Sequence, residues 1–191
     1  MKIILASGSP RRKELLSSLD IDFTCFHPEI DETLLPNEAP EGYALRLARA
    51  KARKAAETLG DAIYIGADTI VVLDGAIFGK PTDGRDAEDI LECLSGATHS
   101  VITAYCLFEA SSGREVLKAV ETKVTIKELT DIEIADYVAT LEPMDKAGAY
   151  AIQGKGEFMV EGIDGSYSNV VGLPMEALTE SLKEFLPTST R

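Results

Sequence analysis

The hydrophobic and polar positions of this chain fall into apolar runs of strand length and longer segments with helical periodicity. Apolar runs occupy residues 2–6, 62–73, 99–108 and 116–126. The run at 62–73 is almost continuous, which is typical of a central strand covered on both faces. The pattern predicts helices over residues 10–19, 40–59, 84–94, 130–140 and 174–185. The alternation of strands and helices predicts a mixed α/β architecture.

Two segments between these elements show neither an apolar run of strand length nor helical periodicity. Residues 20–40 are acidic and irregular, and residues 145–173 are rich in glycine. Asp74-Gly75 suggests a hairpin turn after the central strand. The sequence shows no internal repeat and no linker long enough to separate independent domains. At 191 residues we therefore expect a single domain over 1–191, or two closely packed lobes.

Charge and cysteine content narrow the classes of partner and compartment. The formal net charge of −13 argues against a nucleic-acid polymer, which needs a broad basic surface. A small polyanion is compatible, because it needs only a local cluster of cations. Three scattered cysteines suit a reducing interior, and buried packing is the expected role of Cys25, Cys93 and Cys106. No signal peptide or membrane-spanning stretch is visible, so we expect a cytoplasmic protein without a membrane partner.

The segment Ser7–Lys13 joins the first strand to the first helix and carries three cations. Gly8 permits close approach of the backbone to a ligand, and Pro10 suits a first helical turn. Arg11, Arg12 and Lys13 at a helix start favour phosphate oxygens. A plain strand-to-helix turn with solvated cations is the alternative. The pattern is not a Walker A loop, because the required Gly-Lys-Ser/Thr ending is missing.

Asp68 is the most anomalous residue, because nearly all its neighbours in the run at 62–73 are apolar. A buried, unpaired carboxylate there costs several kcal/mol, on the order of its desolvation penalty. Asp68 must therefore pair with a cation, bind a metal or face a cleft, or else cap a turn next to Gly66. Helix 40–59 is predicted to carry an apolar stripe of Leu45, Ala48, Ala52, Ala56 and Leu59. Lys51 lies at the border of this stripe, and Arg49 and Arg53 flank the other side. Periodicity does not decide which of these cations points inward.

Three further segments add polar groups. Lys80 lies between Gly79 and Pro81, although a solvated loop lysine is the simpler interpretation, and Glu32 lies in an acidic stretch that surface solvation also explains. Gln153 offers both a donor and an acceptor, which suits the edge of a nucleobase. No Ser/His/Asp or Cys/His arrangement is visible. Cations for phosphates and carboxylates for magnesium favour attack of water on a phosphoryl group.

In this order, the segments resemble the Maf family of nucleoside triphosphate pyrophosphatases. The resemblance runs from residue 3 to about 175 and rests on six collinear pieces: Ser7–Arg12, Gly66–Thr69, Gly79–Pro81, Leu94–Gly96 with His99, Asp145–Gly154 and Gly165–Pro174. It implies a fold related to the inosine triphosphate pyrophosphatases, with a long mixed sheet, helices at both sides and a cleft between two lobes. It also implies hydrolysis of a nucleoside triphosphate to the monophosphate and pyrophosphate, dependent on magnesium, manganese or cobalt.

The resemblance assigns roles to individual positions. Asp68 matches the catalytic carboxylate, read as general base or metal ligand, and Glu32 matches a second acidic position near the metal and substrate. Positions linked to substrate choice are matched by Arg12, Thr69 and Gln153. Positions that hold the phosphate chain are matched by Ser9, Arg11, Lys51 and Lys80. The family also suggests a homodimer.

The segment Asp145–Gly154 is similar to the subgroup acting on dTTP and UTP, including modified pyrimidine nucleotides. An amide such as Gln153 satisfies the O4 and N3–H edge of thymine or uracil. Two alternatives remain open at this point: a nucleotide-binding regulator of septum formation, and a pyrophosphatase of the 7-methyl-GTP type. Intact Asp68, Glu32 and Lys80 favour the enzyme over the regulator.

Overall fold

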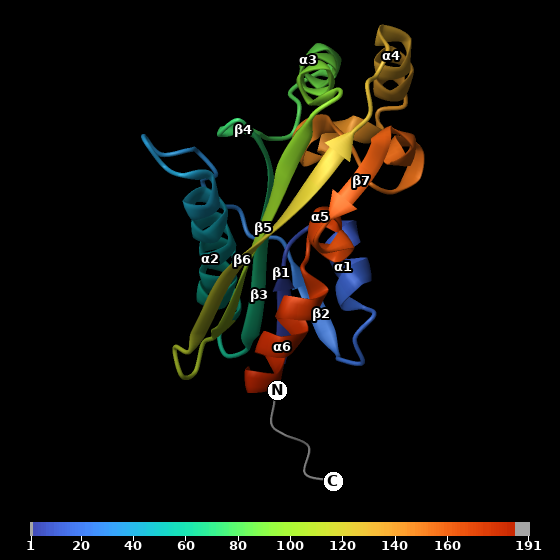
Figure 1. Cartoon of the computed structure of the whole chain (residues 1–191). Helices are drawn as coiled ribbons and strands as arrows, with labels where there is room; N and C mark the ends of the chain where they lie inside the picture. The colour runs from blue at the N-terminus through green and yellow to red at the C-terminus, as the bar shows by residue number, and fades with distance from the viewer. Residues whose placement is uncertain (1, 186–191) are drawn as a thin grey trace. The chain divides into compact units, whose positions relative to one another are not determined.

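A computed structural model describes residues 2–185 of the protein (Figure 1). The chain folds into two compact units, each built from discontinuous parts of the sequence. Among the described residues, the first unit comprises residues 2–68, Thr103–Val120 and residues 172–185, and the second comprises Thr69–Ile102 and Glu121–Val171. Three long strands contribute residues to both units: β3 (Ile63–Leu73), β5 (Thr98–Glu109) and β6 (Glu115–Ile126).

The strands form one mixed sheet. They hydrogen-bond in the order β2-β1-β3-β5-β6-β7, with β4 paired to β3. Strand β1 (Ile3–Ala6) is parallel to β2 (Phe23–Phe26) and to β3. By contrast, β4 (Ala76–Phe78) is antiparallel to β3, and β7 (Val160–Asp164) is antiparallel to β6. The predicted α/β class with a mixed sheet is confirmed.

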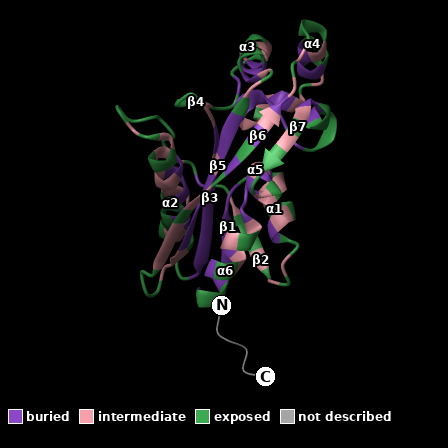
Figure 2. Ribbon diagram, in the orientation of Figure 1, coloured by how far each residue is buried: buried purple, intermediate pink, exposed green. Residues whose placement is uncertain are grey.

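Three helices belong to the first unit: α1 (Pro10–Leu16), α2 (Pro40–Leu59) and α6 (Met175–Phe185). Alternate residues of β3 point to opposite faces, as the pleat of a strand requires. Ile63 and Ile65 join a buried core with side chains of β1, α1 and α6. Gly66, on the opposite face of the strand, lies against α2. The buried residues of β3 are purple in Figure 2, and the expectation of a strand covered on both faces is confirmed.

The second unit contains α3 (Gly84–Leu94), α4 (Asp131–Ala139) and α5 (Tyr167–Val171). Side chains of α3 and α4 pack against β3, β5 and β6 residues of this unit in a second apolar core. Helix α4 begins with a capping box, in which the Thr130 side chain accepts from the Glu133 N–H and the Glu133 carboxylate accepts from the Thr130 N–H. Short 3-10 turns lie between α4 and β7, at Glu142–Asp145, Ala147–Ala149 and Gly154–Met159.

The structure corrects several local expectations. The first helix ends at Leu16 rather than at residue 19, because the Ser17 and Ser18 hydroxyls donate to carbonyls of the last turn. Strands β2 and β7 lie inside the two segments that lacked a clear period. Of the three cysteines only Cys106 is buried, whereas Cys25 and Cys93 are exposed.

The buried stripe of α2 is rotated from the predicted one, since its buried residues are Ala44, Leu47, Ala48, Ala52 and Ala55. Leu59, expected in the stripe, is exposed. Within residues 2–185, no helix has the length and apolar character needed to span a membrane.

Candidate active site

Gly66 brings helix α2 into direct contact with strand β3. A Cβ atom at this position would lie 2.2 Å from the Ala48 carbonyl oxygen and 2.7 Å from the Ala52 nitrogen. Only glycine therefore allows the helix backbone to lie so close to the strand. Because strand side chains alternate, Asp68 lies on the same face as Gly66, two residues further along. The close approach thus places the Asp68 carboxylate beside α2.

Lys51 of α2 holds two carboxylates. Its Nζ lies 2.6 Å from Asp68 Oδ1 and 2.7 Å from Glu32 Oε1. Asp68 is 7% exposed and pairs with a cation, which is one of the alternatives that the sequence left open. Arg49 and Arg53, the other cations of this stretch, pair instead with Glu115 on β6. Lys51 is therefore the cation of this stretch that reaches Asp68.

The loop that carries Glu32 is tied to the first half of α2. The Tyr43 hydroxyl donates to the Glu32 carbonyl oxygen over 2.8 Å, and Arg46 Nη2 donates to the Thr33 carbonyl oxygen over 2.9 Å. Arg46 Nε also forms an ion pair with Glu38 at 2.6 Å. These contacts hold an otherwise exposed acidic loop against the helix that carries Lys51.

Burial governs the protonation of Asp68. Removal of the carboxyl from water raises its pKa above the ordinary range, while the positive charges of Lys51 and Arg12 act in the opposite direction without cancelling the increase. A carboxyl with a raised pKa holds a proton more tightly than a solvated one. Asp68 therefore has the properties of a group that accepts a proton from a bound water molecule.

The Arg12 guanidinium donates to two segments of the first unit that are far apart in the sequence. Its Nε donates to the Gly172 carbonyl oxygen over 2.8 Å, and its Nη1 donates to Ser7 Oγ over 3.2 Å. The Ser9 hydroxyl accepts from the Arg12 N–H and so forms the N-cap of α1. Burial lowers the pKa of the Arg12 guanidinium, and the nearby Asp68 carboxylate opposes this change. Arg12 thus belongs electrostatically to the group of Asp68, Lys51 and Glu32.

Three predicted site residues belong to the second unit. Thr69 comes directly after Asp68 in β3 and is half-buried, whereas Lys80 and Gln153 are exposed. The Gly148 N–H donates to the Gly79 carbonyl oxygen over 3.0 Å, which ties the turn bearing Lys80 to the segment bearing Gln153. Inside this unit, the structure therefore brings these two segments together.

The sequence and its fold resemble known proteins. The family model for Maf-like proteins matches residues 2–185. The chain belongs to the Maf-like family. Two proteins, each named dTTP/UTP pyrophosphatase, are similar along most of their length. The one from Geotalea uraniireducens is 52% identical over 95% of this chain and 93% of its own, and the one from Geobacter metallireducens is 53% identical over 95% of both. The Clostridioides difficile protein of the same name is 46% identical over 97% of this chain and 95% of its own.

A solved structure shows the fold of this Maf-like chain in another protein. The Staphylococcus aureus Ham1 protein matches 97% of this chain and 100% of its own, with a TM-score of 0.56 and 13% sequence identity. This likeness concerns the fold alone.

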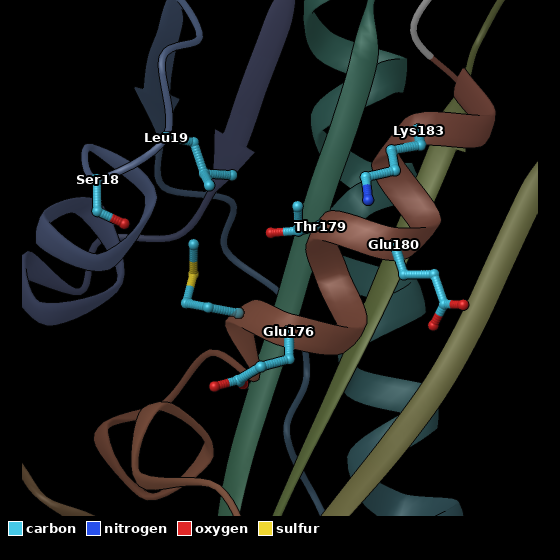
Figure 3. Close-up of a pocket in the computed structure, with 7 residues that line it drawn as sticks. Ser18, Leu19, Glu176, Thr179, Glu180 and Lys183 are labelled. Carbon is cyan, nitrogen blue, oxygen red and sulfur yellow. The ribbon is translucent and has the colours of Figure 1, made fainter.

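A surface pocket of the first unit is unsuited to a triphosphate (Figure 3). It lies between the end of α1 and the helix α6, and its lining residues are Ser18, Leu19, Met175, Glu176, Thr179, Glu180 and Lys183. Two glutamates and one lysine give this lining a net negative charge. None of the predicted site residues of this Maf-like chain contributes to it.

Sequence reasoning missed the residues that support the predicted site residues of this Maf-like protein. Tyr43 lies eight positions before Lys51, close to two helical turns, so the helical period contained a signal for it. Tyr137 and Glu142 contact the backbone on both sides of Gln153. Backbone contacts of this kind leave no pattern in the sequence.

Proposed function

We propose that this protein hydrolyses dTTP and UTP to the nucleoside monophosphate and pyrophosphate. The observation that carries the proposal is the buried Asp68 carboxylate, with a raised pKa, in contact with Lys51 at 2.6 Å. A protein that only binds nucleotides gains nothing from a charged group placed at such cost in an apolar strand. The similarity to proteins named dTTP/UTP pyrophosphatase supports the choice of substrate.

The proposed reaction is the attack of water on the α-phosphorus atom. The water oxygen forms a bond to this phosphorus as the bond from phosphorus to the bridging oxygen breaks, and pyrophosphate leaves. Asp68 accepts the proton of the attacking water as general base. Its raised pKa helps, since general bases work best when their pKa lies near the working pH.

The remaining residues are assigned by charge and chemistry. We assign the phosphate oxygens to the hydroxyl and cationic groups of Ser9, Arg11, Lys51 and Lys80. We assign the choice of substrate to Arg12, Thr69 and Gln153. Cationic groups aimed at developing phosphate charge lower the barrier to phosphoryl transfer. Gln153 is exposed, so its amide is accessible to a base edge.

The residues also fit a divalent metal. Among the described residues, no group of three or more His, Cys, Asp or Glu side chains is placed to hold a metal ion. Glu32 and Asp68 nevertheless gather on one cation, Lys51 Nζ. Magnesium takes one or two carboxylates and completes its shell with phosphate oxygens and water, so this pair suits a metal that arrives with the nucleotide. Bound there, the metal would polarise the phosphate oxygens and neutralise their charge.

The proposal is tested by measuring pyrophosphate release from dTTP, UTP, CTP, dATP, GTP, ITP and 7-methyl-GTP. Each reaction is run with and without magnesium, manganese or cobalt, and Asp68→Asn serves as the blank. We expect metal-dependent release from dTTP and UTP that the blank lacks. In ¹⁸O-labelled water, the label should appear in the monophosphate, because water attacks the α-phosphorus.

Release of orthophosphate in place of pyrophosphate would overturn the proposed bond cleavage. Preferred release from 7-methyl-GTP would overturn the substrate class. A folded protein that releases pyrophosphate from none of the seven nucleotides would overturn the enzymatic proposal and favour a nucleotide-binding regulator.

A further inference from the structure

The loop that carries Gln153 is held by its backbone on both sides. Before Gln153, the Ala151 N–H donates to the Tyr137 hydroxyl oxygen over 3.2 Å. After it, the N–H groups of Lys155 and Gly156 donate to the two carboxylate oxygens of Glu142 over 3.2 and 3.1 Å. Three backbone donors within six residues therefore converge on two side chains of the same unit.

Glu142 and Tyr137 act as one group. The Tyr137 hydroxyl donates to Glu142 Oε1 over 3.1 Å, and Tyr137 is buried on α4. Burial raises the pKa of the Tyr137 phenol, and the negative charge of Glu142 raises it further, so the phenol keeps its proton and remains a donor. Glu142 follows the end of α4, where its own N–H donates to Thr140 Oγ1 over 3.2 Å. A helix end thus fixes the carboxylate that receives the loop.

The loop is shaped to fit this carboxylate. Gly154 has a φ of +75°, and a Cβ atom there would lie 2.9 Å from Glu142 Oε2. A Cβ atom at Gly156 would lie 2.5 Å from the Ala151 carbonyl oxygen. Both glycines therefore permit approaches that other residues would obstruct. The contact is built into the backbone of the loop and does not depend on flexible side chains of the loop.

We propose that Glu142, together with Tyr137, is a positioning residue that sets the base selectivity of the enzyme by fixing the backbone around Gln153. The inference rests on the proposed function, in which Gln153 contacts the base. An amide carries a donor and an acceptor, and rotation exchanges them. A Gln153 free to move would serve the edge of cytosine as well as that of thymine or uracil. Selectivity for thymine or uracil over cytosine therefore needs a loop that holds Gln153 in one orientation.

The test compares Glu142→Gln and Tyr137→Phe with the wild-type protein in steady-state hydrolysis of dTTP and CTP. Glu142→Gln keeps the shape of the side chain but turns an N–H₂ group toward one of the backbone donors. Loss of one such hydrogen bond should raise the KM for dTTP about tenfold, with kcat changed less than about threefold. The preference for dTTP over CTP should fall about tenfold. Gln153→Ala, measured alongside, gives the selectivity expected when base recognition is lost.

Glu133→Gln is the matched control. Glu133 lies at the other end of α4 and accepts from the Thr130 N–H over 2.8 Å and from Lys127 Nζ over 2.7 Å. The control should lower thermal stability as much as Glu142→Gln does and leave the selectivity unchanged. Hydrogen–deuterium exchange adds a readout independent of activity: the peptide containing Lys155 and Gly156 should exchange faster in Glu142→Gln but not in Glu133→Gln.

Each outcome separates this inference from the proposed function. Wild-type selectivity in both Glu142→Gln and Tyr137→Phe, with Gln153→Ala unselective, would overturn the positioning role and leave the pyrophosphatase intact. If Glu142→Gln does not fold, Tyr137→Phe, which removes a single hydroxyl, decides the question. If the wild type hydrolyses no nucleotide, the ratio of dTTP to CTP dissociation constants replaces the kinetic ratio. A protein that also binds neither nucleotide would overturn both proposals.

Discussion

Asp68→Asn separates the chemical role of Asp68 from its structural cost. In the wild type, Lys51 Nζ donates to Asp68 Oδ1 over 2.6 Å. The asparagine keeps an oxygen that can accept this hydrogen bond, but it cannot take a proton from water. General base catalysis contributes about 10²–10⁴-fold, so turnover should fall by that factor, or about 3 to 5 kcal/mol of transition-state stabilisation. Binding of the nucleotide should change much less, because the cations that hold phosphate remain.

The effect on stability is expected to be small. At 2.6 Å the attraction between Lys51 and Asp68 amounts to about 6 kcal/mol for an effective dielectric constant of about 20. The desolvation penalty of two buried ions is also several kcal/mol each. The raised pKa of Asp68 shows that its own desolvation outweighs the attraction. Since Lys51 keeps Glu32 as a partner, the free energy of unfolding of Asp68→Asn should lie within about 1 kcal/mol of the wild-type value.

The pH dependence gives a second, independent signature. The folded wild-type protein retains the Asp68 proton in a pH range where the unfolded chain has lost it, because folding raises this pKa. Wild-type stability should therefore fall as the pH rises above the ordinary carboxyl value of about 4, until the folded pKa is passed. Asp68→Asn should lack this contribution. Activity should rise with pH over the same range as Asp68 ionises.

Urea unfolding at several pH values and pyrophosphate release at saturating dTTP measure these quantities on the same preparations. Retention of more than about a tenth of the wild-type turnover would refute the role of Asp68 as general base. A loss of more than about 3 kcal/mol of stability would show that the pair with Lys51 stabilises the fold, against the balance derived above.

Three further substitutions test other contacts. Gly66→Ala places a Cβ atom 2.2 Å from the Ala48 carbonyl oxygen. In urea unfolding, this substitution should lower the free energy of unfolding by more than about 3 kcal/mol. A loss below about 1 kcal/mol would contradict the close approach of α2 to the strand. Lys51→Met removes a positive charge beside Asp68, which should raise the pKa of Asp68 further. The acid limb of the pH profile of kcat/KM should therefore move up by about 1 pH unit. An acid limb at the wild-type pH would argue against an electrostatic interaction between Lys51 and Asp68. Gln153→Ala should change the dTTP-to-CTP ratio of kcat/KM more than the overall rate, and an equal loss on both nucleotides would count against base recognition.

The sequence was most informative where one residue broke a strong pattern. Asp68 stands out because the strand around it is apolar, and burial physics then requires a partner. The identity of that partner was not predictable, because alanines surround Lys51 on α2 and leave the helical stripe poorly defined. Gly66 determines that Lys51 is the partner, because the close approach of α2 at this glycine sets which side of the helix faces the strand.

The missed strands and the loop contacts have a different cause. Strand β2 (Phe23–Phe26) is four residues long and pairs with β1 from outside the apolar runs, so neither its length nor its surroundings mark it. The contacts of Glu142 with the loop around Gln153 run to backbone N–H groups, which every residue except proline possesses. Such contacts depend on tertiary placement, and side-chain periodicity contains no information about them.

The backbone hydrogen bond from the Gly148 N–H to the Gly79 carbonyl oxygen joins the turn bearing Lys80 to the segment bearing Gln153. We assign Lys80 to the phosphate chain and Gln153 to the base, so this bond links the two ends of the proposed nucleotide contact within one unit. A substitution that loosens one of these segments is therefore expected to disturb the other, and a change in base preference should be accompanied by a change in phosphate binding.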